Sequence, residues 1–171
     1  MGIKSYIVNF LKSLKHGGVK YVSVTFTNPD ARYANKKVFI SGGSEGLGRA
    51  MAKAYLAEGA EVIVTGRSKE KLSNFQLSES NAKLYTLVWD ALDFDSYKQK
   101  FDEAVSMMGR IDIFVNNVGG GMSKYEPWNA YTAEVLDRTY DINTKSMFLM
   151  CQMEGLYMIC LLYTSPSPRD S

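Results

Sequence analysis

The sequence predicts an α/β protein built on a doubly wound parallel sheet, with helices covering both faces. Short apolar segments alternate with amphipathic ones between residues 37 and 159, an alternation typical of right-handed βαβ units. A glycine-rich segment, residues 42–48, separates the first apolar segment from the first amphipathic one. The composition is that of an ordinary globular domain, with 46% hydrophobic and 22% charged residues in a chain of 171.

The chain begins with a basic extension, residues 1–35, which we treat as a unit separate from the α/β domain. Up to residue 37 the chain carries seven Lys and Arg but a single acidic residue, Asp30, whereas the remainder has an excess of acids. The extension has no long apolar run of the kind that a secretory signal requires. We therefore interpret it as an attachment arm.

Within this extension the pattern predicts one helix and one strand. Apolar residues recur at helical spacing from Ile3 to Leu14, and Gly17-Gly18 ends the helix. Lys20–Thr27 alternates in the way a strand does. We expect the helix to pack on its own subunit or on a partner subunit, and contact of residues 3–15 with a membrane surface is the alternative that we favour less.

In the α/β part, the predicted strands are short and apolar, and the predicted helices repeat their apolar residues every three or four positions. Gly59 and Gly109 end two of the helices. We expect strands at Lys37–Ser41, Glu61–Thr65, Lys83–Val88 and Ile111–Val115, and helices at Leu47–Glu58, Lys69–Asn74, Ser96–Met108 and from Ala133 onward. The stretch Met147–Leu162 is too short and too polar at its centre to span a membrane, so we expect a buried, interface-forming helix.

The glycine-rich segment carries the first chemical information. The dinucleotide fingerprint G-x-G-x-x-G is absent because position 51 is Met, and the segment instead reads Ser41-Gly42-x-x-x-Gly46-x-Gly48. Its glycines permit a tight turn, a close approach of phosphate and close packing of helix on strand, and the helix that follows offers free N–H groups to an anion. A strand before it and a helix after it favour nucleotide binding over a simple turn.

The end of the second predicted strand indicates which nucleotide. No carboxylate stands there to hold a ribose 2′-hydroxyl; the chain has Gly66, Arg67 and Ser68 instead. A guanidinium is suited to a 2′-phosphate. A solvated loop arginine is the alternative interpretation.

Four motifs, taken in order, resemble the classical short-chain dehydrogenase/reductase family. The segment Ser41–Gly48 is similar to the family's T-G-x-x-x-G-x-G motif, and Asp90 in Trp89-Asp90-Ala91 is similar to the acidic residue after its third strand. Asn116-Asn117-Val118-Gly119 resembles its N-N-A-G motif, and Asn143 in Asp141-Ile142-Asn143 resembles its helix asparagine. The resemblance covers about residues 36–159.

The resemblance implies a Rossmann-like, three-layer α/β/α domain over residues 36–159, of which this chain holds the N-terminal half, with the first four strands in the order 3-2-1-4. It places Asp90 and Ala91 near the adenine and gives Asn143 the task of positioning the catalytic lysine through a water. The residues that it implies in cofactor binding are Ser41, Gly42, Ser44, Glu45, Gly46, Leu47, Gly48, Arg67, Ser68, Asp90, Ala91, Asn117, Val118 and Gly119.

The activity that the resemblance implies is reduction of a small-molecule carbonyl, or oxidation of an alcohol, by a homo-oligomer in the cytoplasm. Gly66 stands where NAD-using members carry an acid, and Arg67 follows it. This pair of residues favours NADP over NAD. Glu45 departs from this pattern, because some NADP-preferring members place a basic residue there. A non-catalytic nucleotide-binding or scaffolding protein is the second interpretation.

The catalytic Ser and the Tyr-x-x-x-Lys pair of the resembled family are missing from the sequence. Tyr33 and Lys37 have the required spacing, but they precede the first predicted strand, so we interpret this spacing as chance. In the family the Tyr exchanges a proton with the carbonyl or alcohol and the Lys lowers the pKa of that Tyr.

The last residues differ in character from the rest. Residues 160–170 are identical to one reading frame of a common transposase-based sequencing adapter, so we expect 160–171 to be a non-native tail and authentic sequence to end near Ile159. A natural Ser/Pro-rich tail is the alternative.

The composition argues against two classes of ligand, metal ions and nucleic acids. One His and two Cys leave little for a metal site or a disulfide framework, and a net charge of +2 gives no reason to expect a nucleic-acid partner. We therefore predict neither a metal nor a nucleic acid as a ligand.

Overall fold

The computed structural model describes residues 31–79, 83–120 and 128–164 of the chain. The helix and the strand predicted within residues 1–30 lie outside the described residues, as does most of the predicted tail.

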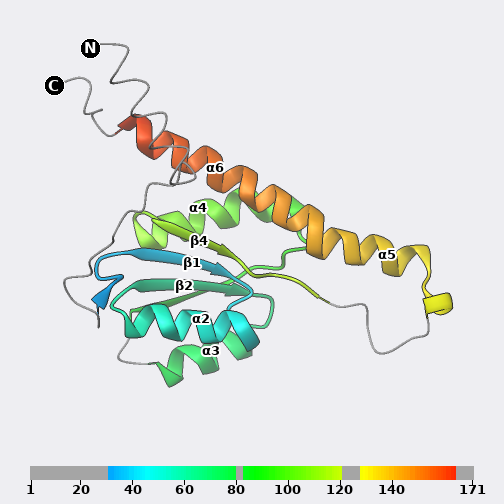
Figure 1. Cartoon of the computed structure of the whole chain (residues 1–171), viewed down its shortest axis with the longest axis horizontal. Helices are drawn as coiled ribbons and strands as arrows, with labels where there is room; N and C mark the ends of the chain where they lie inside the picture. The colour runs from blue at the N-terminus through cyan, green and yellow to red at the C-terminus, as the bar shows by residue number, and fades with distance from the viewer. Residues whose placement is uncertain (1–30, 80–82, 121–127, 165–171) are drawn as a thin grey trace, which may run out of the picture.

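Four parallel strands form one sheet in the order β3-β2-β1-β4 (Figure 1). The strands are β1 (Lys37–Ser41), β2 (Glu61–Gly66), β3 (Leu84–Val88) and β4 (Ile113–Asn116). Lys37 pairs with Glu61 on one side of β1, and Val38 pairs with Ile113 on the other. The carboxyl ends of all four strands therefore lie at the same end of the sheet. Both the predicted parallel sheet and the predicted order of its strands are confirmed.

Helices cover both faces of the sheet, which gives three layers (Figure 1). On one face lie α2 (Gly46–Ala57) and α3 (Lys69–Ser78); on the other lie α4 (Tyr97–Met108), preceded by the short η2 (Phe94–Ser96), and α6 (Ser146–Thr164). Successive residues of a strand point to opposite faces. Val38 and Ile40 pack in a cluster with Phe75 of α3, whereas Phe39 between them packs in a second cluster with Phe101 of α4.

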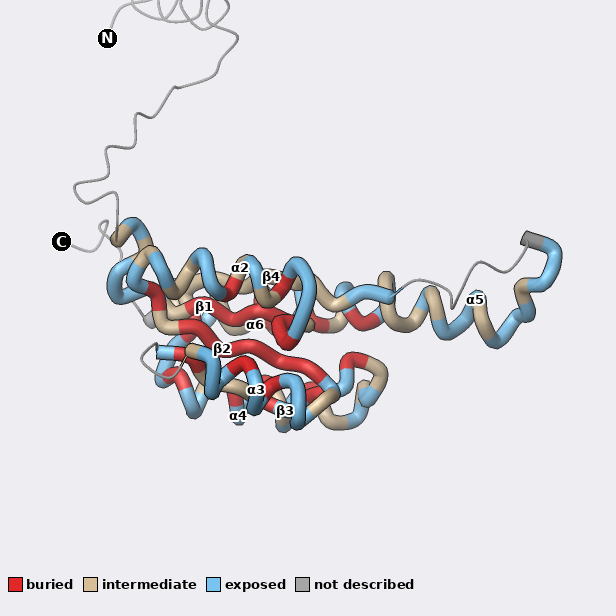
Figure 2. The backbone as a smooth tube through the Cα atoms, turned by 90° about the horizontal axis from the view of Figure 1, so that it is seen from below, coloured by how far each residue is buried: buried red, intermediate tan, exposed pale blue. Residues whose placement is uncertain are grey.

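Burial decreases from the middle of the sheet to the strand at its edge. Figure 2 shows the backbone of β1 and β2 almost wholly buried. Every residue of β4 is only half-buried, and β4 forms one edge of the sheet in the described part of the chain.

The helix predicted from Ala133 onward is two helices joined by a π-helical turn. After η3 (Trp128–Ala130), α5 (Ala133–Tyr140) is capped by Thr132, whose Oγ1 accepts a hydrogen bond from Val135 N at 3.4 Å. The turn η4 (Asp141–Lys145) separates α5 from α6. Its Asn143 donates from Nδ2 to the carbonyl of Thr139 at 2.8 Å, and such a side-chain donor competes with the backbone donors of a regular helix.

Two predictions about helices need correction. The helix α3 continues to Ser78 instead of ending at Asn74, because Phe75 is completely buried and extends the packed face by a further turn. The helix α6 buries only part of its surface in this chain: Met150 and Glu154 are buried, whereas Phe148 is 68% exposed. Among the described residues, no helix is sufficiently long and apolar to cross a bilayer.

Candidate functional site

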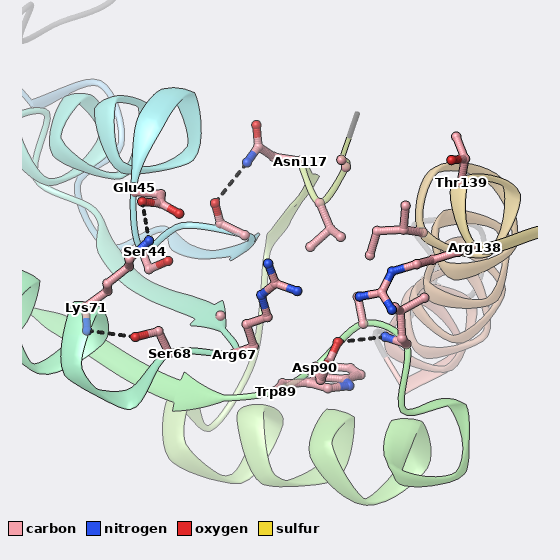
Figure 3. A pocket seen from close by; sticks show the side chains of 18 of the residues that line it. Ser44, Glu45, Arg67, Ser68, Lys71, Trp89, Asp90, Asn117, Arg138 and Thr139 are labelled. Carbon is pink, nitrogen blue, oxygen red and sulfur yellow. Dashed lines mark hydrogen bonds and ion pairs between the residues drawn. The ribbon is translucent and has the colours of Figure 1, made fainter. Parts of the chain in front are cut away.

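A cleft of about 580 Å³ opens at the edge of the sheet where the strands end (Figure 3). The loops after the four strands form one wall, and α5 with the start of η4 forms the other. Most of the predicted cofactor contacts line this cleft: Gly42, Ser44, Glu45, Arg67, Ser68, Asp90, Ala91, Asn117, Val118 and Gly119. Ligands of open parallel sheets bind outside the carboxyl ends of the strands, so the cleft lies where such a ligand is expected.

Five predicted residues lie beside the cleft without lining it: Ser41, Gly46, Leu47, Gly48 and Asn143. Of these, Ser41 is completely buried and Leu47 is exposed.

Ser41 and Asn117 fasten the glycine loop to the end of β4. The Oγ of Ser41 accepts hydrogen bonds from the backbone N–H groups of Asn117 and Val118, at 3.0 and 3.3 Å. In return, Asn117 Nδ2 donates to the carbonyls of Ser41 and Gly42, at 3.3 and 3.0 Å. Two motifs that are distant in sequence therefore form one rigid floor of the cleft.

Gly48 is required by close packing between these two motifs. A Cβ at this position would overlap the carbonyl oxygen of Gly42 and would lie 2.6 Å from Asn117 Nδ2. Gly46 is different, because it has a φ of +57° and nothing within 4 Å of its Cβ position. Only one of the two glycines is thus fixed by contacts within the protein, while the other leaves open space at the start of α2.

The first backbone N–H groups of α2 are available as hydrogen-bond donors to a ligand. Glu45 stands at the N-cap position in extended conformation, but its side chain accepts no hydrogen bond from the first turn. The first backbone N–H groups of a helix have no partner within the helix, and the positive end of its dipole attracts anions. This geometry can hold a phosphate group next to Ser44 and Glu45.

Charged side chains gather where β2 ends (Figure 3). Lys71, in the first turn of α3, places its Nζ 2.7 Å from Glu45 Oε2, and its backbone N–H donates to Ser68 Oγ at 3.3 Å. Lys71, followed by the weaker field of Arg67, lowers the pKa of the Glu45 carboxyl. Arg67 itself makes no hydrogen bond or ion pair with any described residue.

The turn after β3 is held by aromatic residues beneath it. Trp89 is buried against Tyr97, with their ring centroids 5.2 Å apart, and Tyr97 Oη donates to the carbonyl of Ala91 at 2.6 Å. Burial raises the pKa of Tyr97 to about 12, so it remains a donor at neutral pH. Asp90, which lines the cleft, accepts from Leu92 N through Oδ1 at 3.0 Å (Figure 3).

Asn143 holds the loop after β4 by two hydrogen bonds. Its Oδ1 accepts from Gly120 N at 3.1 Å and its Nδ2 donates to Gly120 O at 2.8 Å. The side chain is therefore committed to the loop that carries Gly119 and Gly120 into the cleft.

The α5 wall was not predicted. Val135, Arg138 and Thr139 of α5 and Ile142 of η4 line this side of the cleft and follow the spacing of one helical face, which was the available signal. Figure 3 shows Arg138 reaching from α5 into the cleft opposite Arg67. Lys71 was also missed, because its position depends on how α3 packs against α2.

Tyr33 and Lys37 do not approach the cleft. Both lie at the amino end of β1, where the Tyr33 ring packs 4.8 Å from that of Tyr55 and Lys37 Nζ donates to the carbonyl of Met108. Within the described ranges, no three His, Cys, Asp or Glu side chains gather in a way that could hold a metal ion.

Comparison with known proteins gives a consistent result. The family model described as short chain dehydrogenase matches residues 36–160. The 7alpha-hydroxysteroid dehydrogenase of Bacteroides fragilis is 31% identical over 124 residues, which are 71% of this chain and 46% of that protein. The levodione reductase of Leifsonia aquatica is 34% identical over 127 residues, which are 72% of this chain and 47% of the relative.

Solved structures agree in fold. A short-chain dehydrogenase/reductase of unknown function from Caenorhabditis elegans, solved with cofactor, is 26% identical with a TM-score of 0.68 and covers 75% of this chain and 50% of its own. A short chain dehydrogenase from Bacillus anthracis is 32% identical with a TM-score of 0.66, and the match covers 72% of this chain and 50% of that protein. The chain thus spans about half the length of the relatives it matches.

Proposed function

Because the chain belongs to the short-chain dehydrogenase family, we propose that it supplies the cofactor-binding half of an NADP-dependent oxidoreductase acting on a carbonyl or alcohol. The relatives whose names state a reaction, such as the levodione reductase and the gluconate 5-dehydrogenase of Gluconobacter oxydans, support this reaction class. The family match also favours it over a non-catalytic nucleotide-binding scaffold.

The observation that carries the choice of NADP is the environment of Arg67. Its guanidinium lines the cleft without a hydrogen-bond or ion-pair partner among the described residues, and Gly66 before it has no carboxylate to hold a ribose 2′-hydroxyl. A planar cation of this kind binds phosphate oxygens in a bidentate manner.

The other residues fit a dinucleotide in the same cleft. The start of α2 would receive the pyrophosphate, Asp90 would accept a hydrogen bond from the adenine, and Ser41 with Asn117 would keep the loop in place. The bound cofactor would supply or take a hydride at its nicotinamide C4. Asn143 would hold the Gly119–Gly120 loop at the nicotinamide end.

We further propose that the catalytic Ser, Tyr and Lys belong to sequence that these 171 residues do not include. Tyr33 and Lys37 lie at the wrong end of the sheet to reach the cleft. The 171-residue chain should therefore bind nucleotide but transfer no hydride. Absorbance at 340 nm with carbonyl substrates and NADPH, compared with a longer reading frame, tests this; turnover by the short chain would contradict it.

The cofactor choice is tested by replacing Arg67 with Asp. NADPH binding should weaken by about 2–4 kcal/mol, because an ion pair is lost and a repulsion is gained. NADH binding should stay the same or improve. Arg110→Asp, at the far end of the sheet beside Asp112, is the control and should change neither affinity. Equal losses of both cofactors in Arg67→Asp, measured by titration of intrinsic fluorescence, would refute the assignment.

A further inference from the structure

The ion pair between Glu45 and Lys71 lies inside the candidate cleft instead of on a remote surface. The two side chains line the cleft together with Arg67 and Ser68. Lys71 Nζ and Glu45 Oε2 are 2.7 Å apart, and both side chains are more than half exposed. A ligand that enters this corner therefore meets two cations, one of which already has an anionic partner.

We propose that Lys71 is a second cation of the 2′-phosphate subsite and that Glu45 competes with the phosphate for it. This inference rests on the proposed function, since it places a 2′-phosphate beside Arg67. Glu45 would thereby act as an internal counter-anion that reduces the preference for a 2′-phosphorylated nucleotide over its 2′-hydroxyl counterpart.

The geometry of α3 supports Lys71 in this role. Ser68 caps the helix by accepting from Lys71 N, which fixes Lys71 in the first turn of α3, and Arg67, directly before this cap, lines the same cleft. An ammonium group has three donors, so Lys71 can bind Glu45 and a phosphate oxygen at the same time. The positive end of the α3 dipole acts in the same direction.

The charges of the corner give the sign of each effect. With Arg67, Lys71 and Glu45 present, two positive charges are opposed by one negative charge. Removing the charge of Glu45 leaves both cations for the phosphate. Removing Lys71 leaves the carboxylate of Glu45 facing the phosphate beside Arg67 alone.

A purely structural role for the pair has a matched control in the same protein. Lys53 of α2 and Glu79 at the end of α3 form a second ion pair, also at 2.7 Å, that joins the same two helices. Neither residue lines the cleft. If the Glu45–Lys71 pair only ties α2 to α3, then variants of the two pairs should behave alike.

The test measures the affinity of the 171-residue chain for adenosine 2′,5′-bisphosphate and for 5′-AMP by calorimetric titration, and compares their ratio among variants. Glu45→Gln should raise affinity for the bisphosphate about three- to fivefold. Lys71→Met should lower it about fivefold or more. Affinity for AMP should change less than about twofold in both, and the double variant should fall between the single ones.

Lys53→Met should leave the affinity ratio unchanged, and Lys71→Arg, which keeps the charge, should stay close to the wild type. The proposal is overturned if Lys71→Met and Glu45→Gln leave the ratio unchanged, or if Lys53→Met shifts it equally. Failure of the proposed function has a different signature, in which Arg67→Asp fails to change the ratio. A wild-type chain that binds neither nucleotide overturns both. Glu45→Gln is at an exposed position, so it keeps the test valid if Lys71→Met does not fold.

Discussion

At the scale of single residues, the absence of a side chain at Gly48 allows the glycine loop to pack closely against Asn117. Gly48→Ala should destabilise the fold by about 1–3 kcal/mol, because its Cβ would collide with the Gly42 carbonyl and the Asn117 amide. The matched control is Gly155→Ala in α6, where nothing lies within 4 Å of the added Cβ. That variant should gain about 0.5–1 kcal/mol from helix propensity. Urea denaturation measures both, and the same sign of change in the two variants would contradict the packing argument.

The residues that the sequence could identify are those placed by local pattern. Arg67 and Asp90 each lie two residues after the end of a predicted strand, and parallel strands bring their carboxyl ends together, so both were expected at the same end of the sheet. Lys71 and Arg138 instead reach the cleft from helices. Which way a helical side chain points depends on packing between elements, and a sequence pattern carries little of that information.

At the scale of elements, α6 meets β4 through a buried carboxyl group. Glu154 accepts a hydrogen bond from Asn116 Nδ2 at 2.7 Å, while Glu154 Oε1 and Asn116 Oδ1 have no partner in the described part of the chain. Burial raises the pKa of Glu154 above its ordinary value of 4.5. The folded chain therefore binds this proton more tightly than the unfolded chain does, and stability falls as the pH rises from 4.5 through the raised pKa.

Glu154→Gln should remove this loss, because an amide stays neutral and can also donate to Asn116 Oδ1. We expect the variant to be more stable than the wild type by about 1–2 kcal/mol at pH 7–8. Near pH 4 the difference should almost vanish. Thermal unfolding across this pH range is the measurement, with Glu103→Gln on the exposed side of α4 as the control. A gain that does not depend on pH would refute the role of ionisation.

Element boundaries were less predictable than element types. The four strands and the helices between them were expected from apolar periodicity, whereas the break between α5 and α6 was not. That break involves the contacts of Asn143 with Gly120 and Thr139. Gly120 is distant from Asn143 in sequence, so no local pattern could predict the π-helical turn.

At the scale of the whole molecule, six of the ten large apolar side chains that stay exposed among the described residues lie on α5 and α6: Leu136, Tyr140, Met147, Phe148, Leu156 and Ile159. The edge strand β4 lies beneath α6 and is itself only half-buried. Apolar surfaces of this kind associate in water. We propose that this surface mediates self-association of the chain.

The 171-residue chain should accordingly show a mass that rises with concentration in light scattering. Phe148→Lys, which charges the most exposed of these aromatic side chains, should lower the mass. Lys98→Glu on the exposed side of α4 is the control and should not. A monomeric wild-type chain over the whole concentration range would contradict the proposal.

The π-helical turn has a consequence for how insertions and deletions act on this chain. Each residue of an α-helix turns the chain by about 100° around the helix axis. Deleting one residue of Asp141–Lys145 would therefore rotate α5 by about that angle relative to α6. If α6 kept Met150 and Glu154 buried, Arg138 and Val135 would no longer line the cleft. The length of this turn, independently of its side chains, therefore keeps the cleft-lining face of α5 aligned with the buried face of α6.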